Sequence, residues 1–165
     1  MDISRRQDRI DAPGPWVWLV PAAYIVHVVE EAFGGHGLLE WMAGSGGVDL
    51  SLVEFLGVNL VGLGALCLAA WASRKWAAWR WPLVSGATIF IANGVWHAAI
   101  CLMSSSYIPG VLTGIVVYIP LGCIVMFRLR HLVSPRMYIS AIVIGMVIHA
   151  ATIWIVLQMP GFEMG

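Results

Sequence analysis

Charged residues are scarce in this sequence. Lys, Arg, Asp and Glu together make up 11% of the 165 residues, whereas hydrophobic residues make up 60%. A soluble domain carries about 25% charged residues, so this chain has too few of them to cover a surface that faces water. An ordinary soluble domain is therefore excluded, and lipid is indicated as the surrounding solvent. The clusters of Lys and Arg are no larger than a membrane boundary requires, which argues against a nucleic-acid partner.

A signal peptide and a cysteine framework are also missing. The first eleven residues, MDISRRQDRID, are polar, and no short apolar run with a small-residue cleavage site follows them. We therefore expect the first apolar segment to remain in the mature protein. The three cysteines, Cys67, Cys101 and Cys123, fall within apolar stretches. We interpret them as packing residues, not as disulfides or thiolate metal ligands.

What the sequence does contain is long apolar segments. A helix needs about 20 apolar residues to cross a bilayer, and open strands would leave backbone groups unpaired in lipid. Five segments meet this requirement: residues 16–33, 52–71, 81–103, 111–127 and 137–157. The sequence therefore predicts an all-α integral membrane bundle of five transmembrane helices over residues 15–158, with tails at residues 1–14 and 159–165.

The distribution of Lys and Arg predicts the orientation of this bundle. These residues gather before the first segment, between the second and third, and between the fourth and fifth. In a five-helix chain these three places lie on one side of the membrane. The positive-inside rule then puts the N-terminus in the cytoplasm and the C-terminus outside. We expect this topology in the cell's inner (plasma) membrane, with residues 1–14 as the cytoplasmic tail and 159–165 as the outer tail.

Several ionisable or strongly polar residues lie within the apolar segments. Each ionisable one costs at least about 2.5 kcal/mol at the centre of a spanning helix. They are His27, Glu30, Glu31, His97 and His149, with Asn59 and Asn93 as polar companions. At 1.5 Å per residue they all lie about 18–24 Å from the cytoplasmic ends of their helices. We predict that they meet in one pocket in the outer half of the membrane, to which the fourth helix adds little.

The spacing of these residues indicates their chemistry. His27 shares a helix face with Glu30 and Glu31, because residues three and four apart are neighbours on a helix. Such a group can ligate a metal or act as an acid–base pair with unequal carboxylates. We predict a zinc or iron site whose ligands are His27, Glu30, His97 and His149.

The remaining roles follow from this assignment. Glu31 is the expected acid–base group, with Glu30 and His97 also taking part in catalysis. Asn93 shares a face with His97, and Asn93 and Tyr107 are expected to orient the substrate.

The chain also resembles a family of small multispanning membrane proteins named for an HxxEE motif. That motif is present here as His27-Val28-Val29-Glu30-Glu31. The family has a second characteristic histidine, which His97 matches, and a YxPG motif, which Tyr107-Ile108-Pro109-Gly110 matches. The resemblance spans about residues 16–120. Because the family's function is uncharacterised, the resemblance implies which residues matter and not what they do.

The leading functional hypothesis is an integral membrane enzyme that acts on a lipid or isoprenoid-like substrate, with a divalent transition metal at the His/Glu site. A metal-free isomerase or cyclase that uses a glutamic acid as proton donor is one alternative. A proton- or metal-coupled transport or binding protein is another. Membrane lipid and a small hydrophobic substrate are the expected partners, and a homo-oligomer is compatible with the sequence.

Overall fold

The computed structural model describes residues 12–44 and 50–157, and most of this part of the chain is helical. In chain order the elements are η1 (Pro15–Trp18), α2 (Leu19–Phe33), α3 (Leu38–Gly44), α4 (Leu52–Ser73), η2 (Ala77–Trp79), α5 (Trp81–Ser104), α6 (Val111–Thr113), η3 (Gly114–Tyr118), α7 (Ile119–Leu129) and α8 (Pro135–Leu157). The elements η1 and η2 are 3₁₀ helices, whereas η3 is a turn of π-helix within the fourth span.

Five helices in the described residues are long and apolar enough to cross a membrane. They are Pro15–Phe33, Leu52–Ser73, Ala77–Ser104, Val111–Leu129 and Pro135–Ile155. The predicted class, an all-α bundle of five spanning helices, is confirmed, and the chain is a multi-pass membrane protein. The observed spans differ from the predicted ranges only at their ends. The predicted outer tail and most of the N-terminal tail lie outside the described residues.

Local sequence signals determine where the spans begin. Ser51 and Glu54 form a capping box at the start of α4, in which the Ser51 hydroxyl accepts from the Glu54 N–H and the Glu54 carboxylate accepts from the Ser51 N–H. Pro15 and Pro135 open their helices, where a missing N–H has no consequence. The short segment LLEWMA in the loop after α2 forms the helix α3.

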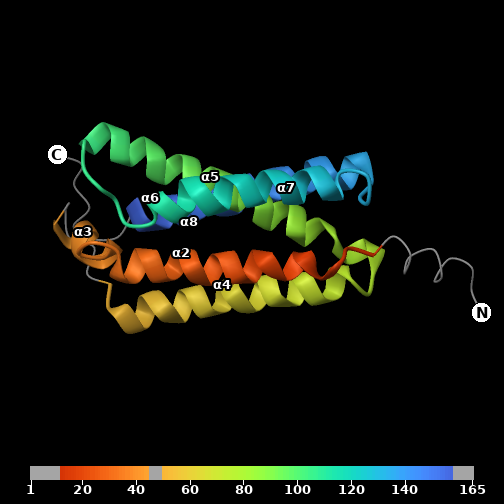
Figure 1. Ribbon diagram of the computed structural model, residues 1–165, viewed down its shortest axis with the longest axis horizontal. Helices are drawn as coiled ribbons and strands as arrows, with labels where there is room; N and C mark the ends of the chain where they lie inside the picture. The colour runs from red at the N-terminus through yellow and green to blue at the C-terminus, as the bar shows by residue number, and fades with distance from the viewer. Residues whose placement is uncertain (1–11, 45–49, 158–165) are drawn as a thin grey trace, which may run out of the picture.

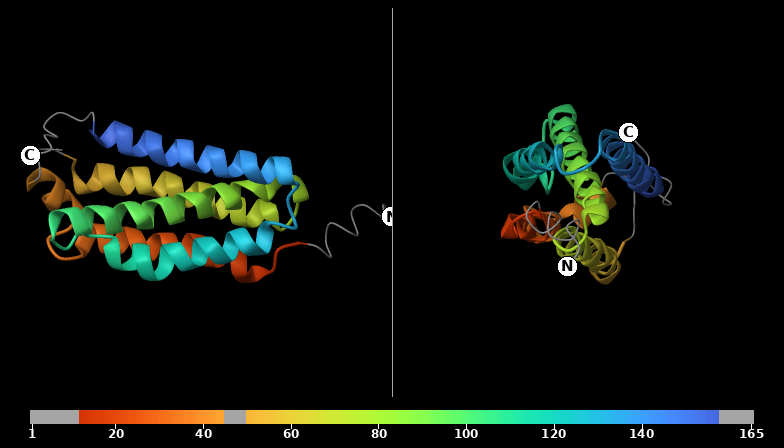
Figure 2. Two further views of the ribbon diagram at one scale, coloured as in Figure 1. Left: turned by 90° about the horizontal axis from the view of Figure 1, so that it is seen from above. Right: turned by 90° about the vertical axis from the view of Figure 1, so that its right-hand side faces the viewer.

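The central element of the bundle is α5. It packs against α4, α7, η3 and α8, whereas α2 packs mainly against α4. Figure 1 shows α2 and α4 side by side below the other spans, and the end-on view in Figure 2 shows α5 between α7 and α8. The helix α8 is held mainly through its contact with α5. A residue on the inner face of α5 can therefore meet residues from several other spans.

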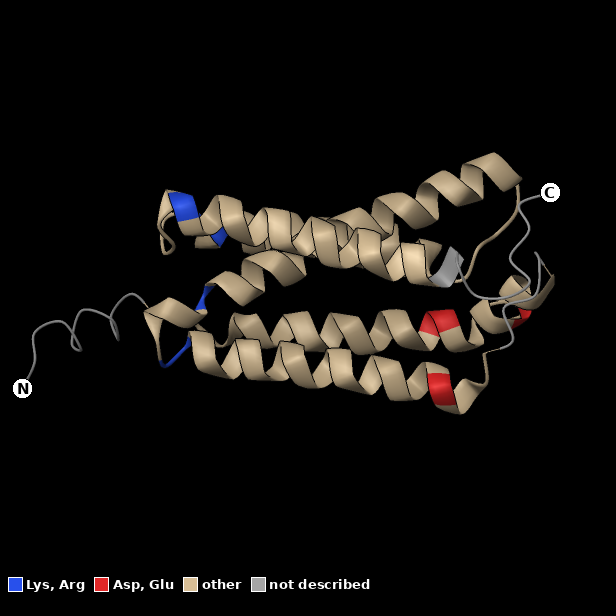
Figure 3. Ribbon diagram, turned by 180° about the vertical axis from the view of Figure 1, so that it is seen from behind, with Lys and Arg blue, Asp and Glu red and all other residues tan. Residues whose placement is uncertain are grey.

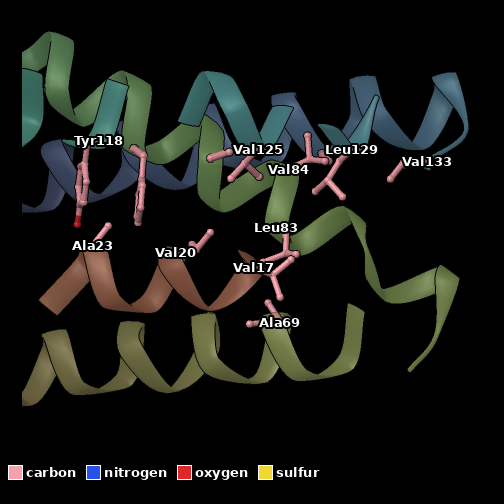
Figure 4. Packing of buried hydrophobic residues seen from close by; sticks show 14 residues of the cluster. Val17, Val20, Ala23, Ala69, Leu83, Val84, Tyr118, Val125, Leu129 and Val133 are labelled. Carbon is pink, nitrogen blue, oxygen red and sulfur yellow. The ribbon is translucent and has the colours of Figure 1, made fainter. Parts of the chain in front are cut away.

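The charged side chains of the described residues separate to the two ends of the bundle. Lys and Arg lie at the end from which the N-terminal tail emerges, which we call the basic end, and the glutamates of α2, α3 and α4 lie at the opposite, acidic end (Figure 3). The half of the bundle toward the basic end is filled by an apolar core that includes Val17, Leu83, Val84, Val125 and Leu129 (Figure 4). The histidines and glutamates of the spans lie toward the acidic end.

Two glycines let α5 and the fourth span approach at the level of the polar residues. A Cβ added to Gly94 would lie 2.5 Å from the carbonyl oxygen of Gly114, which is closer than real Cβ contacts. This contact brings the backbone of η3 against α5 one turn before His97. No larger side chain fits at Gly94 unless the two spans separate.

We expect Gly94→Ala to lower the free energy of unfolding by about 1–3 kcal/mol, because the added methyl overpacks a backbone contact. Gly64→Ala in α4 is the matched control, since a Cβ at Gly64 meets nothing within 4 Å. Alanine is the better helix former by about 1 kcal/mol, so this control is expected to be neutral or stabilising. Thermal unfolding of both variants in detergent micelles measures the difference. Equal stability of the two variants would contradict the glycine contact.

Candidate metal centre

Three of the predicted site residues meet at one point inside the bundle. His27 Nε2 lies 3.4 Å from Glu31 Oε1, and His97 Nε2 lies 3.2 Å from the same oxygen. All three residues are buried. His27 and Glu31 are one turn apart on α2, and His97 comes from α5, its ring edge-on to that of His27 with centroids 5.3 Å apart. Among the described residues this group could hold a metal ion, because its ligand atoms lie within 4.8 Å of one another.

Glu30 does not belong to this group, although the sequence pattern predicted it as a metal ligand. Its carboxylate accepts hydrogen bonds from the Tyr107 hydroxyl (2.8 Å), the Leu112 N–H (3.0 Å), and both the N–H (2.7 Å) and the hydroxyl of Thr113. A carboxylate has about four acceptor positions, and these four donors fill them. Glu30 therefore has no free lone pair to offer to a metal.

The position of Glu30 has a clear structural reason. The fourth span begins at Val111 after Gly110, which has no side chain to cap the free N–H groups of the first turn. Glu30 reaches across from α2 and accepts from two of these N–H groups, those of Leu112 and Thr113. Its negative charge also lies at the positive end of the helix dipole. Glu30 thus acts as the N-cap of a helix that lies far along the chain.

The contacts of Thr113 fix the proton on the imidazole of His27. The single hydroxyl proton of Thr113 is donated to Glu30, so the Thr113 oxygen must accept from His27 Nδ1, which lies 2.7 Å away. A neutral His27 then carries its proton on Nδ1 and presents the lone pair of Nε2 to Glu31. This orientation of a histidine by a hydrogen bond at its other nitrogen is typical of metal-binding histidines.

In a neutral His27 with its proton on Nδ1, no hydrogen therefore lies between Nε2 and the Glu31 carboxylate oxygen. The lone pair of His27 Nε2 faces a carboxylate oxygen, which is repulsive unless a proton or a cation lies between them. In a tetrahedral zinc site with bonds of 2.0–2.1 Å, neighbouring ligand atoms are about 3.3 Å apart. The two separations that involve the Glu31 oxygen, 3.4 and 3.2 Å, are close to this value, and all three ligand atoms lie within 4.8 Å of one another. The residues present could thus hold a divalent metal with two histidine ligands and one glutamate ligand.

The loop that carries the YxPG sequence, residues 105–110, covers the centre at the acidic end, and we call it the lid. A Cβ added to Gly110 would lie 2.7 Å from His97 Cε1 and 3.0 Å from His27 Cε1. Gly110 also has φ of +94°, which glycine adopts readily and other residues rarely do. Partial burial and the neighbouring Glu30 carboxylate raise the pKa of Tyr107 to about 12, so its hydroxyl remains a donor at neutral pH.

The HxxEE motif, His97 and the YxPG motif, which are separate in the sequence, thus lie next to one another in the structure. Residues 18–125 match the model of a family described as "protein of unknown function with HXXEE motif". This match covers more than half of the chain. The chain belongs to the HXXEE family. No curated protein and no solved structure matches it.

The geometry explains the parts of the HXXEE motif by their different partners. The histidine and the second glutamate, His27 and Glu31, face the buried centre with His97. The first glutamate, Glu30, lies on the other side of His27 and accepts hydrogen bonds from the tyrosine of YxPG and from the start of the fourth span. The glycine of YxPG lies directly against both imidazoles. The motif therefore combines the candidate ligands His27 and Glu31 with Glu30, which holds the lid through its hydrogen bond with Tyr107.

Other residues predicted for the HXXEE site lie elsewhere. His149 is buried on α8, on the same face as Ala141 and Gly145, which pack on α5. It lies outside the three-residue group but within electrostatic range of His97. Asn59 accepts from the Tyr24 hydroxyl at 2.7 Å and donates to the Phe55 carbonyl, so it joins α2 to α4.

Asn93 differs from Asn59 in having a free acceptor. Its Oδ1 atom is buried and has no hydrogen-bond partner among the described residues. The same is true of Nδ1 of His97, one turn further along α5. Two unpaired polar atoms on this side of α5 mark the surroundings of the centre as a place where a further polar group is expected.

The fourth span contributes more than the sequence pattern suggested. Thr113 orients His27, and Tyr118 lies against it with ring centroids 4.1 Å apart. The prediction that this helix adds little was therefore wrong. Hydroxyl groups hydrogen-bond without carrying charge, so they do not stand out in an apolar segment as imidazoles and carboxylates do. The available signal was a threonine four residues after the YxPG proline.

A groove of about 350 Å³ lies beside the lid, between it and α3. Its lining residues are Gly35, His36, Gly37, Glu40, Trp41, Gly44, Tyr107 and Pro109. His36 and Glu40 form an exposed pair at its edge, with Nδ1 and Oε1 3.7 Å apart. Tyr107 borders the groove with its ring and bonds Glu30 with its hydroxyl, so it separates the groove from the centre.

Proposed function

We propose that this protein is an integral membrane enzyme whose His27–Glu31–His97 centre binds a divalent transition metal, zinc or iron, and acts on a lipid or isoprenoid-like substrate. The observation that carries this proposal is the convergence of His27 Nε2 and His97 Nε2 on one carboxylate oxygen at tetrahedral spacing. Two histidines and a glutamate are also the ligand set of several catalytic zinc sites, which keep the fourth position open for water or substrate.

The surroundings of the centre support a catalytic role for the metal. A bound metal polarises a carbonyl or phosphoryl oxygen, or lowers the pKa of a bound water so that it becomes a nucleophile. The three residues of the centre are buried, and electrostatic effects are stronger in a buried site than in water. An apolar substrate is favoured because it can reach a buried site in the bundle from the surrounding lipid.

The orientation of the bundle completes the proposal. The Lys and Arg residues at the basic end put that end in the cytoplasm by the positive-inside rule, with the N-terminus. The centre then lies in the outer half of the inner membrane, and the C-terminus lies outside. This orientation rests on the positions of Lys and Arg. It makes the acidic end the side from which the substrate would enter.

Transport is less well supported than catalysis. The half of the bundle toward the basic end is packed with apolar residues such as Val17, Leu83 and Leu129 (Figure 4). The buried hydroxyls there, those of Ser73, Ser85 and Thr88, each donate their proton to a backbone carbonyl. A polar path from the centre to the basic end is absent from the described residues, which favours a site open on one side.

A metal-free acid–base enzyme is the second candidate, and the same contacts favour it. A proton shared between Glu31 and His27 or His97 would relieve the repulsion that a metal otherwise relieves. Such a group could protonate an alkene or an epoxide, as an isomerase or a cyclase requires. The two candidates differ in whether the purified protein contains stoichiometric metal.

Elemental analysis of the detergent-purified protein tests the proposal. We expect about one equivalent of zinc or iron, as for a single site of this kind, and we expect His27→Ala to lose it. His149→Ala is the control, because it removes a buried histidine that lies outside the three-residue group and is expected to keep the metal. A folded wild-type protein without metal would contradict the metal centre and favour the acid–base candidate.

A further inference from the structure

The hydroxyl of Tyr118 is a buried polar group next to the centre. The side chain is 2% exposed, and its oxygen has no hydrogen-bond partner among the described residues. The ring lies between two others: it stacks on Phe90 with centroids 3.8 Å apart and planes 6° apart, and it lies against His27 with centroids 4.1 Å apart. Tyr118 therefore forms part of the wall of the centre.

A π-helical turn of the backbone determines the direction of the Tyr118 side chain. Tyr118 is the last residue of the π-helical turn Gly114–Tyr118, and Pro120 follows, which has no N–H to donate. In a continuous α-helix each residue turns by about 100°, so the extra residue of a π turn changes which side chain faces α2. Such turns occur frequently at functional sites. This one directs Tyr118 inward between α5 and α2.

Packing alone does not explain a tyrosine at this position. A buried hydroxyl without a partner is destabilising, and phenylalanine would give the same ring contacts without it. Figure 4 shows the hydroxyl oxygen at the end of the ring that points toward α2. Tyr118 is close enough to Glu31 and Tyr24 for their charges to act on it. The Tyr118 hydroxyl has no hydrogen-bond partner among the described residues, so its proton is free to be donated to a bound molecule.

We propose that the Tyr118 hydroxyl donates a hydrogen bond to an oxygen ligand of the metal centre, and that the substrate is an apolar molecule with a carbonyl or ester oxygen at that position. This inference rests on the proposed function. The metal would bind the oxygen from one side and Tyr118 from another. Negative charge that develops on that oxygen would be stabilised by both, as in an oxyanion hole.

The test uses cobalt as the metal and acetohydroxamate as an oxygen ligand with a carbonyl group. Wild type and Tyr118→Phe are loaded with Co²⁺ in detergent, and the visible absorption of the metal is followed as acetohydroxamate is added. We expect equal affinity for Co²⁺ but about tenfold weaker binding of acetohydroxamate by the variant, since a hydrogen bond to a charged ligand is lost. Tyr138→Phe is the matched control, because its hydroxyl donates to the Met126 carbonyl at the basic end.

The possible results separate this inference from the proposed function. Equal acetohydroxamate affinity in wild type and Tyr118→Phe, or no spectral change in wild type, overturns the role of Tyr118 and leaves the metal centre standing. Loss of Co²⁺ from Tyr118→Phe also overturns it, because the residue would then only hold His27 in place. Failure of wild type to bind Co²⁺ overturns both proposals. The melting temperature of metal-free Tyr118→Phe is expected to be unchanged or higher, whereas an internal partner for the hydroxyl would make it lower.

Discussion

Replacing Glu31 with Gln is expected to lower the affinity for zinc by more than about 100-fold. Loss of a residue that only supports a ligand typically lowers metal affinity about 10–100-fold, and Glu31 supplies the oxygen that both histidines face. Glutamine keeps the size of the side chain but removes its negative charge. Competition with a chelator of known affinity, measured on purified wild type and variant, gives the ratio directly.

Glu30→Gln is the matched control, because it makes the same chemical change at the adjacent residue. The amide NH₂ of glutamine would face donors, since all four acceptor positions of Glu30 are taken by Tyr107, Leu112 and Thr113. We expect a loss of about 1–3 kcal/mol in the free energy of unfolding. Zinc affinity should fall only about tenfold, because Glu30 acts on His27 through Thr113 and not on the metal.

The two variants are therefore expected to show opposite patterns. Glu31→Gln should lose the metal with little effect on the stability of the metal-free protein, and Glu30→Gln should lose stability and keep most of the metal affinity. The reverse pattern would assign the ligand role to Glu30, as the sequence pattern predicted. An equal effect of both variants on zinc would mean that the two carboxylates act as a unit.

The second large effect is expected from Gly110→Ala. The new methyl group would lie 2.7 Å from His97 Cε1 at a residue with φ of +94°. Overpacking costs about 1–3 kcal/mol, and the left-handed backbone adds about 1–2 kcal/mol for a residue with a Cβ. Both imidazoles would have to move to accommodate the methyl group, so metal binding is expected to be lost along with stability.

Gly35→Ala separates these two causes. Gly35 also has a positive φ, +59°, but a Cβ there would meet only the ring of Tyr107 at 3.3 Å. This control carries the backbone strain without the contact to the histidines, so it should lose stability and keep the metal. Thermal unfolding and zinc content of the two variants are measured side by side. Retention of a full equivalent of zinc by Gly110→Ala would contradict the close contact of Gly110 with the two imidazoles.

The sequence indicated the fold because membrane proteins obey few and strong rules. Five apolar segments of sufficient length predict five helices, since lipid leaves backbone groups no other partner. The positions of Lys and Arg along the chain are enough to distinguish the two ends of the bundle. Counting residues from those ends placed His27, Glu31 and His97 at similar depths, and the structure brings these three together.

The sequence could not assign the two adjacent glutamates to their partners. At about 100° per residue, Glu30 lies about 60° to one side of His27 and Glu31 about 40° to the other. Both are equally good neighbours of the histidine on an isolated helix. Which one meets His97 depends on how α2 is rotated against α5, and packing determines that rotation.

What the sequence determined by itself is thus the solvent, the number of spans, the end at which the polar residues gather and the helix face that His27 shares with two carboxylates. Only the tertiary structure decided that Glu31 joins the histidines, that Glu30 caps the fourth span, and that Thr113, Tyr118 and Gly110 complete the centre. The physical reason is that helical periodicity is local. The partners of a side chain in a bundle depend on the rotation and approach of neighbouring helices, such as the close approach of α5 and the fourth span at Gly94 and Gly114 and the π turn before Pro120.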